Sequence, residues 1–242
     1  MSTQIHPTRL FVASCVSLVT TSMVFATRAA ITGPMATEFH LSNEQIGLIY
    51  GPSFWGFTIA IFVCGLLVDA VGMRFTHALS SIGYLMGLGL VLLAPQPDLA
   101  EGATVAGIFA HNGTTMLYVG FLLMGLSQGL VEGVINPLVA GMYRDKKAKM
   151  LNVLHAWWPG GMIIGGLACV VLGKFNASWE TKLGMLAIPS LIVLVMAATS
   201  TYPKTERVES NISISDMIKE MTRPIFLLLW GTMFLTAATE LG

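Results

Sequence analysis

The chain has 242 residues, of which 54% are hydrophobic and only 11% are charged, whereas an ordinary soluble domain carries about 25% charged residues. Thirteen Lys and Arg residues balance thirteen Asp and Glu residues, so the formal net charge is zero. This composition excludes a typical soluble domain, and it lacks the basic field with which proteins bind nucleic acid.

Apolar stretches long enough to cross a bilayer recur along the whole chain, since about 20 apolar residues span a hydrocarbon core of about 30 Å. The seven candidate spans are 10–33, 46–68, 75–94, 115–142, 150–172, 183–202 and 224–242. The sequence therefore predicts an all-α, multi-pass integral membrane protein.

Basic residues between the spans predict the orientation, because cytoplasmic loops carry the excess of Lys and Arg. One side has only Lys174 and Lys182. The other side has Arg9, Arg74, Arg144, Lys146, Lys147, Lys149, Lys204, Arg207, Lys219 and Arg223. We therefore expect a cytoplasmic N-terminus, in a bacterial inner (plasma) membrane.

Polarity along the chain predicts three segments. Residues 1–202 form a six-helix transmembrane domain, 203–223 a cytoplasmic interdomain linker, and 224–242 the first helix of a second domain. Inside the linker, apolar residues at helical spacing favour a short amphipathic helix on the membrane face, with a disordered linker as the alternative.

Glycines four residues apart let helix backbones approach closely in lipid. The fourth span has such a row at Gly125, Gly129 and Gly133, and shorter pairs occur in the third and fifth spans. These rows predict tight packing within one bundle.

Charged residues inside predicted spans are candidate functional residues, because a charge near the bilayer centre costs at least about 2.5 kcal/mol. The three are Arg28, Glu132 and Glu240. Gln128, Glu132 and Asn136 follow one another at four-residue spacing and make one polar stripe on the fourth span. A second stripe on the first span contains Ser17, Thr21, Arg28 and Thr32. We expect both stripes to line a shared water-filled cavity rather than Arg28 and Glu132 to form a static ion pair.

His155 and Trp158 begin the fifth span and share a helix face. An aromatic ring beside polar groups suits stacking against the C–H face of a sugar. The alternative is a structural histidine beside a tryptophan of the membrane interface.

The loop between the second and third spans reads Gly65-Leu66-Leu67-Val68-Asp69-Ala70-Val71-Gly72-Met73-Arg74. It resembles the cytoplasmic signature of the major facilitator superfamily, G-x-L-x-D-[RK]-x-G-[RK]-[RK], with Ala70 and Met73 at two of its basic positions. The resemblance implies that Gly65, Asp69, Gly72 and Arg74 form a gating motif, in which Asp69 caps a helix start and Arg74 pins helices together.

Two further segments resemble the fucose–proton symporter and sugar-permease branch of that superfamily: Glu132-Gly133-Val134-Ile135-Asn136-Pro137, and residues 151–160. The resemblance implies a six-helix amino-terminal half built as an inverted 3+3 repeat, plus one further helix, in a chain that looks truncated. It also implies that Glu132 is a cavity carboxylate and that Glu240 faces the cavity from the second half.

These features predict a secondary active transporter, not an enzyme, that moves a sugar or sugar derivative by alternating access. Glu132 is the expected proton-coupling residue, and the expected solute-binding residues are Arg28, Gln128, Asn136, His155 and Trp158. The expected partners are a small solute, a proton or other cation, the bilayer and a second six-helix half, without cofactor or metal. Alternatives are an organic-anion carrier in which Arg28 binds a carboxylate, and a half-transporter that serves as a scaffold or subunit.

Overall fold

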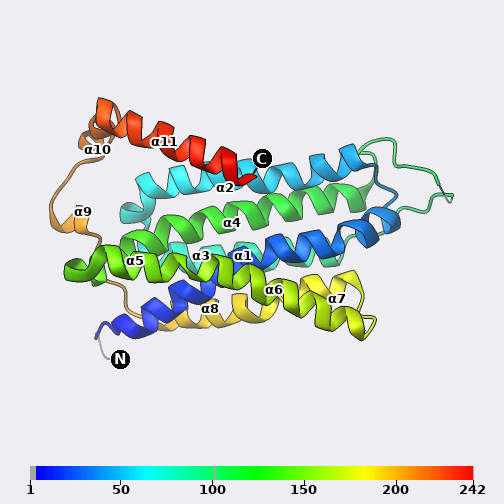
Figure 1. Ribbon diagram of the computed structural model, residues 1–242, viewed down its shortest axis with the longest axis horizontal. Helices are drawn as coiled ribbons and strands as arrows, with labels where there is room; N and C mark the ends of the chain where they lie inside the picture. Colours follow the sequence, from blue (N-terminus) through cyan, green and yellow to red (C-terminus); the bar gives the residue numbers. More distant parts are fainter. Residues whose placement is uncertain (1–3, 101, 242) are drawn as a thin grey trace. The chain divides into compact units, whose positions relative to one another are not determined.

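The computed structural model describes residues 4–100 and 102–241, except for the side chains of 233, 234 and 236–241. Its regular structure in these residues is helical throughout (Figure 1). The helices are α1 (Pro7–Glu38), α2 (Asn43–Val71), α3 (Met73–Leu92), α4 (Asn112–Met142), α5 (Lys147–His155), α6 (Trp157–Lys174), α7 (Trp179–Gly184), α8 (Ala187–Thr199), α9 (Glu206–Glu209), α10 (Ile214–Met221) and α11 (Pro224–Leu241). The chain divides into two compact units, one ending at Pro203 and one beginning at Lys204.

Six stretches of the described chain are long and apolar enough to cross a membrane: α1, α2, α3, α4, the α5–α6 pair and the α7–α8 pair. They confirm six predicted spans, and the seventh predicted span forms α11. The fifth predicted span comprises α5 and α6, and the sixth comprises α7 and α8. Many large apolar side chains on the spans are exposed, as expected for a surface that faces lipid. They include Phe62, Phe75, Ile163, Leu167 and Ile188.

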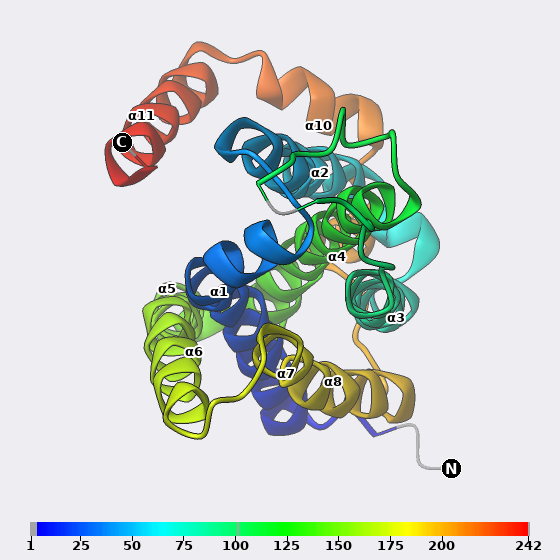
Figure 2. The same ribbon diagram turned by 90° about the vertical axis from the view of Figure 1, so that its right-hand side faces the viewer.

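Helix pairing within the first unit follows an internal symmetry (Figure 2). The second span, α2, packs on the fourth, α4, while the first span, α1, packs on the fifth through α6. Likewise α3 packs on α4 while α8 packs on α1, and α3 also meets α8. If span 1 is exchanged with span 4, span 2 with span 5 and span 3 with span 6, the same set of packed helix pairs results. Since spans one and four run in opposite directions, the repeat is an inverted 3+3 repeat.

The glycine rows lie where neighbouring helices approach closely. A Cβ atom built on Gly125 would stand 2.5 Å from the Cα of Ser53, and one on Gly133 would stand 2.5 Å from the Sγ of Cys64, both on α2. On α6, a Cβ atom on Gly165 would stand 3.0 Å from the Cα of Met23 on α1. The predicted role of the glycines in packing one bundle is therefore confirmed.

We expect Gly129→Ala to destabilise the first unit, because the added methyl group would lie 2.7 Å from Ala60 Cβ and 2.9 Å from the backbone nitrogen of Ile61. Forced overpacking of this kind costs about 1–3 kcal/mol. Gly89→Ala on α3 is the matched control, since its methyl group would have no neighbour within 4 Å. The control should be neutral or stabilising by up to about 1 kcal/mol, because alanine favours the helix. Thermal unfolding in detergent measures both, and equal midpoints for the two variants would contradict the packing argument.

Hydrogen bonds tie together the end of the first unit that we predict to be cytoplasmic. His77 on α3 is fully buried; its Nε2 lies 2.8 Å from Ser17 Oγ on α1, and its Nδ1 lies 2.8 Å from the hydroxyl of Tyr202, beyond α8. Ser17 Oγ also donates to the carbonyl of Ala13. One consistent arrangement has Tyr202 donating to Nδ1, Nε2–H donating to Ser17, and Ser17 donating to Ala13. This chain joins spans one, three and six.

The second unit contains residues 204–223 of the predicted linker and α11. The short amphipathic helix favoured for the linker is present as α10, which begins with a capping box formed by Ser213 and Asp216. Ile214, Met217, Ile218 and Met221 recur along it at helical spacing. Its location on the membrane face stays a prediction.

Candidate functional site

Both spans that carry the central candidate residues contain a proline, and α4 continues past its proline as one helix. Pro137 follows Asn136 within α4, and Pro159 follows Trp158 at the start of α6. Proline has no N–H for the carbonyl four residues earlier, and for Pro159 that carbonyl belongs to His155. The fifth span accordingly breaks at Ala156, which separates α5 from α6. His155 and Trp158 therefore lie on either side of a break in the span.

A hydrogen-bonded chain joins three of the predicted site residues. The Asn136 amide nitrogen donates to the Glu132 carboxylate over 2.9 Å and also to the Glu132 carbonyl over 3.1 Å. The Asn136 amide oxygen lies 3.0 Å from His155 Nε2. Since this oxygen can only accept, Nε2 is the protonated nitrogen of His155. Glu132 is buried at 8% exposure, whereas His155 is exposed, so the chain runs from the protein interior to the surface.

Four aromatic rings surround the guanidinium of Arg28. Its Cζ atom lies 5.3 Å from the ring centre of Phe121, 5.5 Å from that of Phe25, 5.6 Å from Tyr50 and 5.8 Å from Phe54. These distances are within the range of cation–π attraction, worth about 0.5–2 kcal/mol for a ring at a desolvated site. The four rings come from α1, α2 and α4, and we call them the aromatic cage. The aromatic cage stabilises a positive charge that an apolar environment without such rings would disfavour.

The aromatic cage also connects Arg28 to the fifth span. Phe25 packs on Trp158 with ring centres 5.5 Å apart. Trp158, which follows the break in the fifth span, therefore lies beside the aromatic cage. His155, which precedes the break, contacts Asn136. Phe25 thus joins Arg28 to Trp158, and a hydrogen bond joins Asn136 to His155. Trp158 and His155 lie three residues apart on the fifth span.

Arg28 and Gln128 both have buried hydrogen-bond donors without an acceptor in the described part of the chain. The Nε and Nη2 atoms of Arg28 and the Nε2 atom of Gln128 have no hydrogen-bond partner in the part of the chain that the structure describes. Each such buried donor costs about 1–3 kcal/mol. Such donors can form hydrogen bonds to acceptor atoms of a bound molecule.

The polar residues of the first predicted stripe have several different neighbours. No ion pair joins Arg28 to Glu132 within the described residues, which agrees with the expectation that they are not directly paired. Ser17 and Thr21 border a cavity of about 20 Å³ that residues of α1, α3, α4 and α8 line. Thr32 lies 3.2 Å from the Tyr50 hydroxyl. A single water-filled cavity shared by both stripes stays a prediction.

The gating motif forms a one-residue turn between α2 and α3. Gly72 has φ +93°, a conformation that glycine adopts readily and other residues rarely adopt. Arg74 donates to the carbonyl of Ala198 near the end of α8, where the helix dipole favours a cation. Asp69 lies within the last turn of α2, and α3 begins at Met73 without a side-chain cap at Gly72. The capping role of Asp69 at a helix start stays a prediction. Gly65 has no neighbour that would exclude a side chain.

Sequence patterns missed the aromatic cage and the buried His77. Phe25, Phe54 and Phe121 look like ordinary lipid-facing or core residues, because apolar residues face both lipid and neighbouring helices in a membrane protein. A signal was present for His77, since a histidine inside a span is unusual. Glu240, expected to face the cavity from the second half, lies outside the described side chains. No group of three His, Cys, Asp or Glu residues in the described chain is placed to hold a metal ion.

Comparison with known proteins extends these observations. The chain is 30% identical to monosaccharide-sensing protein 2 of Arabidopsis thaliana over 161 residues, which are 64% of this chain and 20% of that protein. It is 24% identical to the hexuronate transporter of Bacillus subtilis over 66% of this chain and 34% of that protein. The chain thus spans between a fifth and about a third of these relatives.

Solved structures show the same fold. The inward-open xylose transporter XylE from Escherichia coli superposes with a TM-score of 0.68 at 13% identity, over 98% of this chain and 57% of that chain. The structure of a D-xylose–proton symporter superposes with a TM-score of 0.58 at 14% identity, over 93% and 54% of the two chains. Residues 10–241 match the family model of the Major Facilitator Superfamily. The chain therefore belongs to the major facilitator superfamily, a family of membrane transporters rather than enzymes.

Proposed function

We propose that this chain is part of a secondary active transporter that moves a sugar or sugar derivative by alternating access, coupled to protons. The observation that carries the proposal is the hydrogen-bonded chain from buried Glu132 through Asn136 to exposed His155. It provides a group that can exchange a proton next to groups that can bind a polar solute. The relatives named for monosaccharides and for xylose–proton symport support the same solute class and coupling ion.

Proton coupling follows from the surroundings of Glu132. The hydrogen-bond donor to its carboxylate is the neutral amide of Asn136. A buried carboxylate without a cationic partner is costly unless it is protonated. Protonation would remove the charge and so permit Glu132 to pass through a conformation closed to water. Deprotonation on the other side of the membrane would complete the cycle.

Hydrogen-bonding groups and an aromatic ring of α4 and the fifth span support the proposed binding of a solute. Gln128 offers an unpaired amide nitrogen, and His155 has a second ring nitrogen besides the one that faces Asn136. The Trp158 ring, held by Phe25, supplies an apolar surface for the C–H face of a sugar. A sugar bound here would contact α4 and the broken fifth span together. We propose that the second half supplies the remaining contacts.

A carrier for sugar acids is a second candidate function, because Arg28 has two buried nitrogen atoms, Nε and Nη2, without a partner. These two atoms lie on one edge of the guanidinium, and a carboxylate can accept from both at once. The hexuronate transporter of Bacillus subtilis, a relative named for a carboxylated sugar, is in line with this candidate.

Uptake by the complete protein in vesicles tests the proposal. We expect neutral sugars to accumulate when an inward proton gradient is imposed and not after the gradient is dissipated. Trp158→Ala should raise the KM for sugar about 3- to 10-fold, corresponding to about 0.5–1.5 kcal/mol of aromatic contact. Trp157→Ala, which removes the exposed neighbouring ring, is the matched control and should leave KM within twofold. Equal effects of the two variants, or gradient-independent uptake, would reject the proposed site or coupling.

A further inference from the structure

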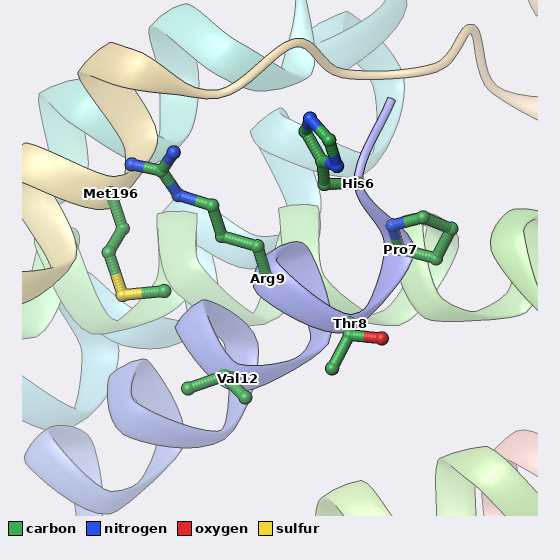
Figure 3. Close-up of a pocket in the computed structure, with 6 residues that line it drawn as sticks. All are labelled: His6, Pro7, Thr8, Arg9, Val12 and Met196. Carbon is green, nitrogen blue, oxygen red and sulfur yellow. The ribbon is translucent and has the colours of Figure 1, made fainter. Parts of the chain in front are cut away.

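A groove lies between the start of α1 and the end of α8, away from the residues proposed for transport (Figure 3). Its volume is about 570 Å³, and it is open along one side. Its lining residues are His6, Pro7, Thr8, Arg9, Val12 and Met196. We call it the α1–α8 groove.

The lining of the α1–α8 groove changes from polar to apolar along the helix axes. On α1, Val12 lies three residues beyond Arg9, which is about 4.5 Å deeper along the helix. On α8, Met196 likewise precedes Thr199, the last residue of the helix, by three residues. Polar groups therefore surround the groove at the helix ends, and apolar groups line it further into the span. A phospholipid has the same order, with its headgroup at the interface and its acyl chains below.

The polar end of the groove favours an anion. Arg9 donates to the Thr199 hydroxyl through one nitrogen, Nη2, which holds its guanidinium at the rim between the two helices. A guanidinium has five N–H donors, so this contact leaves others for a phosphate. His6 adds a second nitrogen-bearing side chain, and none of the six lining residues is acidic.

The location of the α1–α8 groove is also consistent with binding of an anion. The groove lies at the end of the first unit that carries the α2–α3 turn and the start of α5, where we predict the cytoplasmic membrane face (Figure 1). The cytoplasmic leaflet is rich in anionic lipids, and each Lys or Arg near it contributes about 1 kcal/mol of attraction. Val12 is 45% exposed in the structure, so its side chain is available to a neighbouring acyl chain.

We propose that the α1–α8 groove binds one anionic phospholipid, with its phosphate at Arg9 and His6 and its acyl chain along Val12 and Met196. The lipid would connect the first and sixth spans of the half at their predicted cytoplasmic ends. This site is separate from the solute and proton path and does not depend on which solute is transported.

Lipid binding to the purified 242-residue chain tests the proposal. We would titrate the chain in detergent with phosphatidylglycerol or phosphatidylcholine and count bound lipids by native mass spectrometry. We expect phosphatidylglycerol to bind at least about tenfold more tightly than phosphatidylcholine, a difference of about 1.4 kcal/mol. Arg9→Gln should remove most of this preference, and His6→Gln should reduce it by a smaller factor without altering a residue inside α1.

Lys149→Gln is the matched control, because Lys149 is an exposed cation at the same predicted face but outside the groove. It should keep the wild-type preference within twofold. Unchanged phosphatidylglycerol binding by both Arg9→Gln and His6→Gln would overturn the proposal, as would equal binding of the two lipids by the wild-type chain. Competition by millimolar inorganic phosphate as strong as that by phosphatidylglycerol would also overturn it, since the groove would then bind free phosphate rather than lipid.

Discussion

Glu132→Gln in the complete protein should abolish accumulation of solute against a gradient while leaving solute exchange intact. Glutamine has nearly the shape of a protonated glutamate, so it keeps a hydrogen-bonding partner for Asn136 but cannot release a proton. Exchange needs only a neutral side chain at this position, whereas accumulation needs protonation and deprotonation in each cycle. Proton-driven uptake and counterflow in the same vesicles measure the two activities separately. We expect accumulation to fall to the background level and counterflow to stay within about threefold of wild type.

The control for this experiment is Glu44→Gln, which makes the same chemical change at an exposed position in the first turn of α2. It should leave both activities unchanged. Retained accumulation by Glu132→Gln would assign coupling to another residue. Loss of both accumulation and counterflow would indicate that the carboxylate is needed for binding or folding rather than for coupling alone.

Arg28→Gln should move the pH dependence of sugar transport to higher pH while changing sugar affinity less than about threefold at saturating proton concentration. Removing one positive charge near the polar stripe makes protonation of Glu132 easier, whereas a neutral sugar loses no charge partner. This expectation follows from the structure, because the Arg28 guanidinium lies within the aromatic cage and not in the chain that joins Glu132 to His155. Initial rates across pH, with affinities from counterflow, measure the two effects.

The same series decides between the two candidate functions. If Arg28 binds a substrate carboxylate, Arg28→Lys should weaken binding of a hexuronate, because a point charge lacks the paired geometry of a guanidinium. Arg28→Gln should then weaken it further, by more than about tenfold, and affinity would follow charge. A requirement for a carboxylate on every transported solute would reject the neutral-sugar proposal in favour of sugar acids.

Much of the fold follows from local features of the sequence. The six spans of the first unit could be placed from apolar length alone, because a bilayer demands about 20 apolar residues wherever a helix crosses it. The glycine row of α4 indicated close packing because only small residues permit it. The loop from Gly65 to Arg74 resembles the signature of the family, and its Gly72 supplies the positive φ that the one-residue turn requires.

The candidate site was only partly visible in the sequence. Glu132 and Asn136 were recognisable together, because they lie four residues apart on one helix and a buried charge is costly. His155 lies 19 residues beyond Asn136, and its bond to that amide depends on the helix break before Pro159. Periodicity along one continuous helix could not predict that break.

Tertiary structure decided which rings of other spans surround Arg28. Phe25 lies three residues before Arg28 on α1, a spacing that makes them neighbours on one helix. Tyr50 and Phe121 come from two other spans, and no spacing along the sequence relates them to Arg28. In a soluble helix, polarity separates the buried face from the exposed face. In a membrane helix, lipid and protein interior are equally apolar, so composition does not tell which aromatic rings face lipid and which face a neighbouring helix. The sequence of this protein therefore determined where its helices cross the membrane and which charges they carry, while helix packing determined what those charges contact.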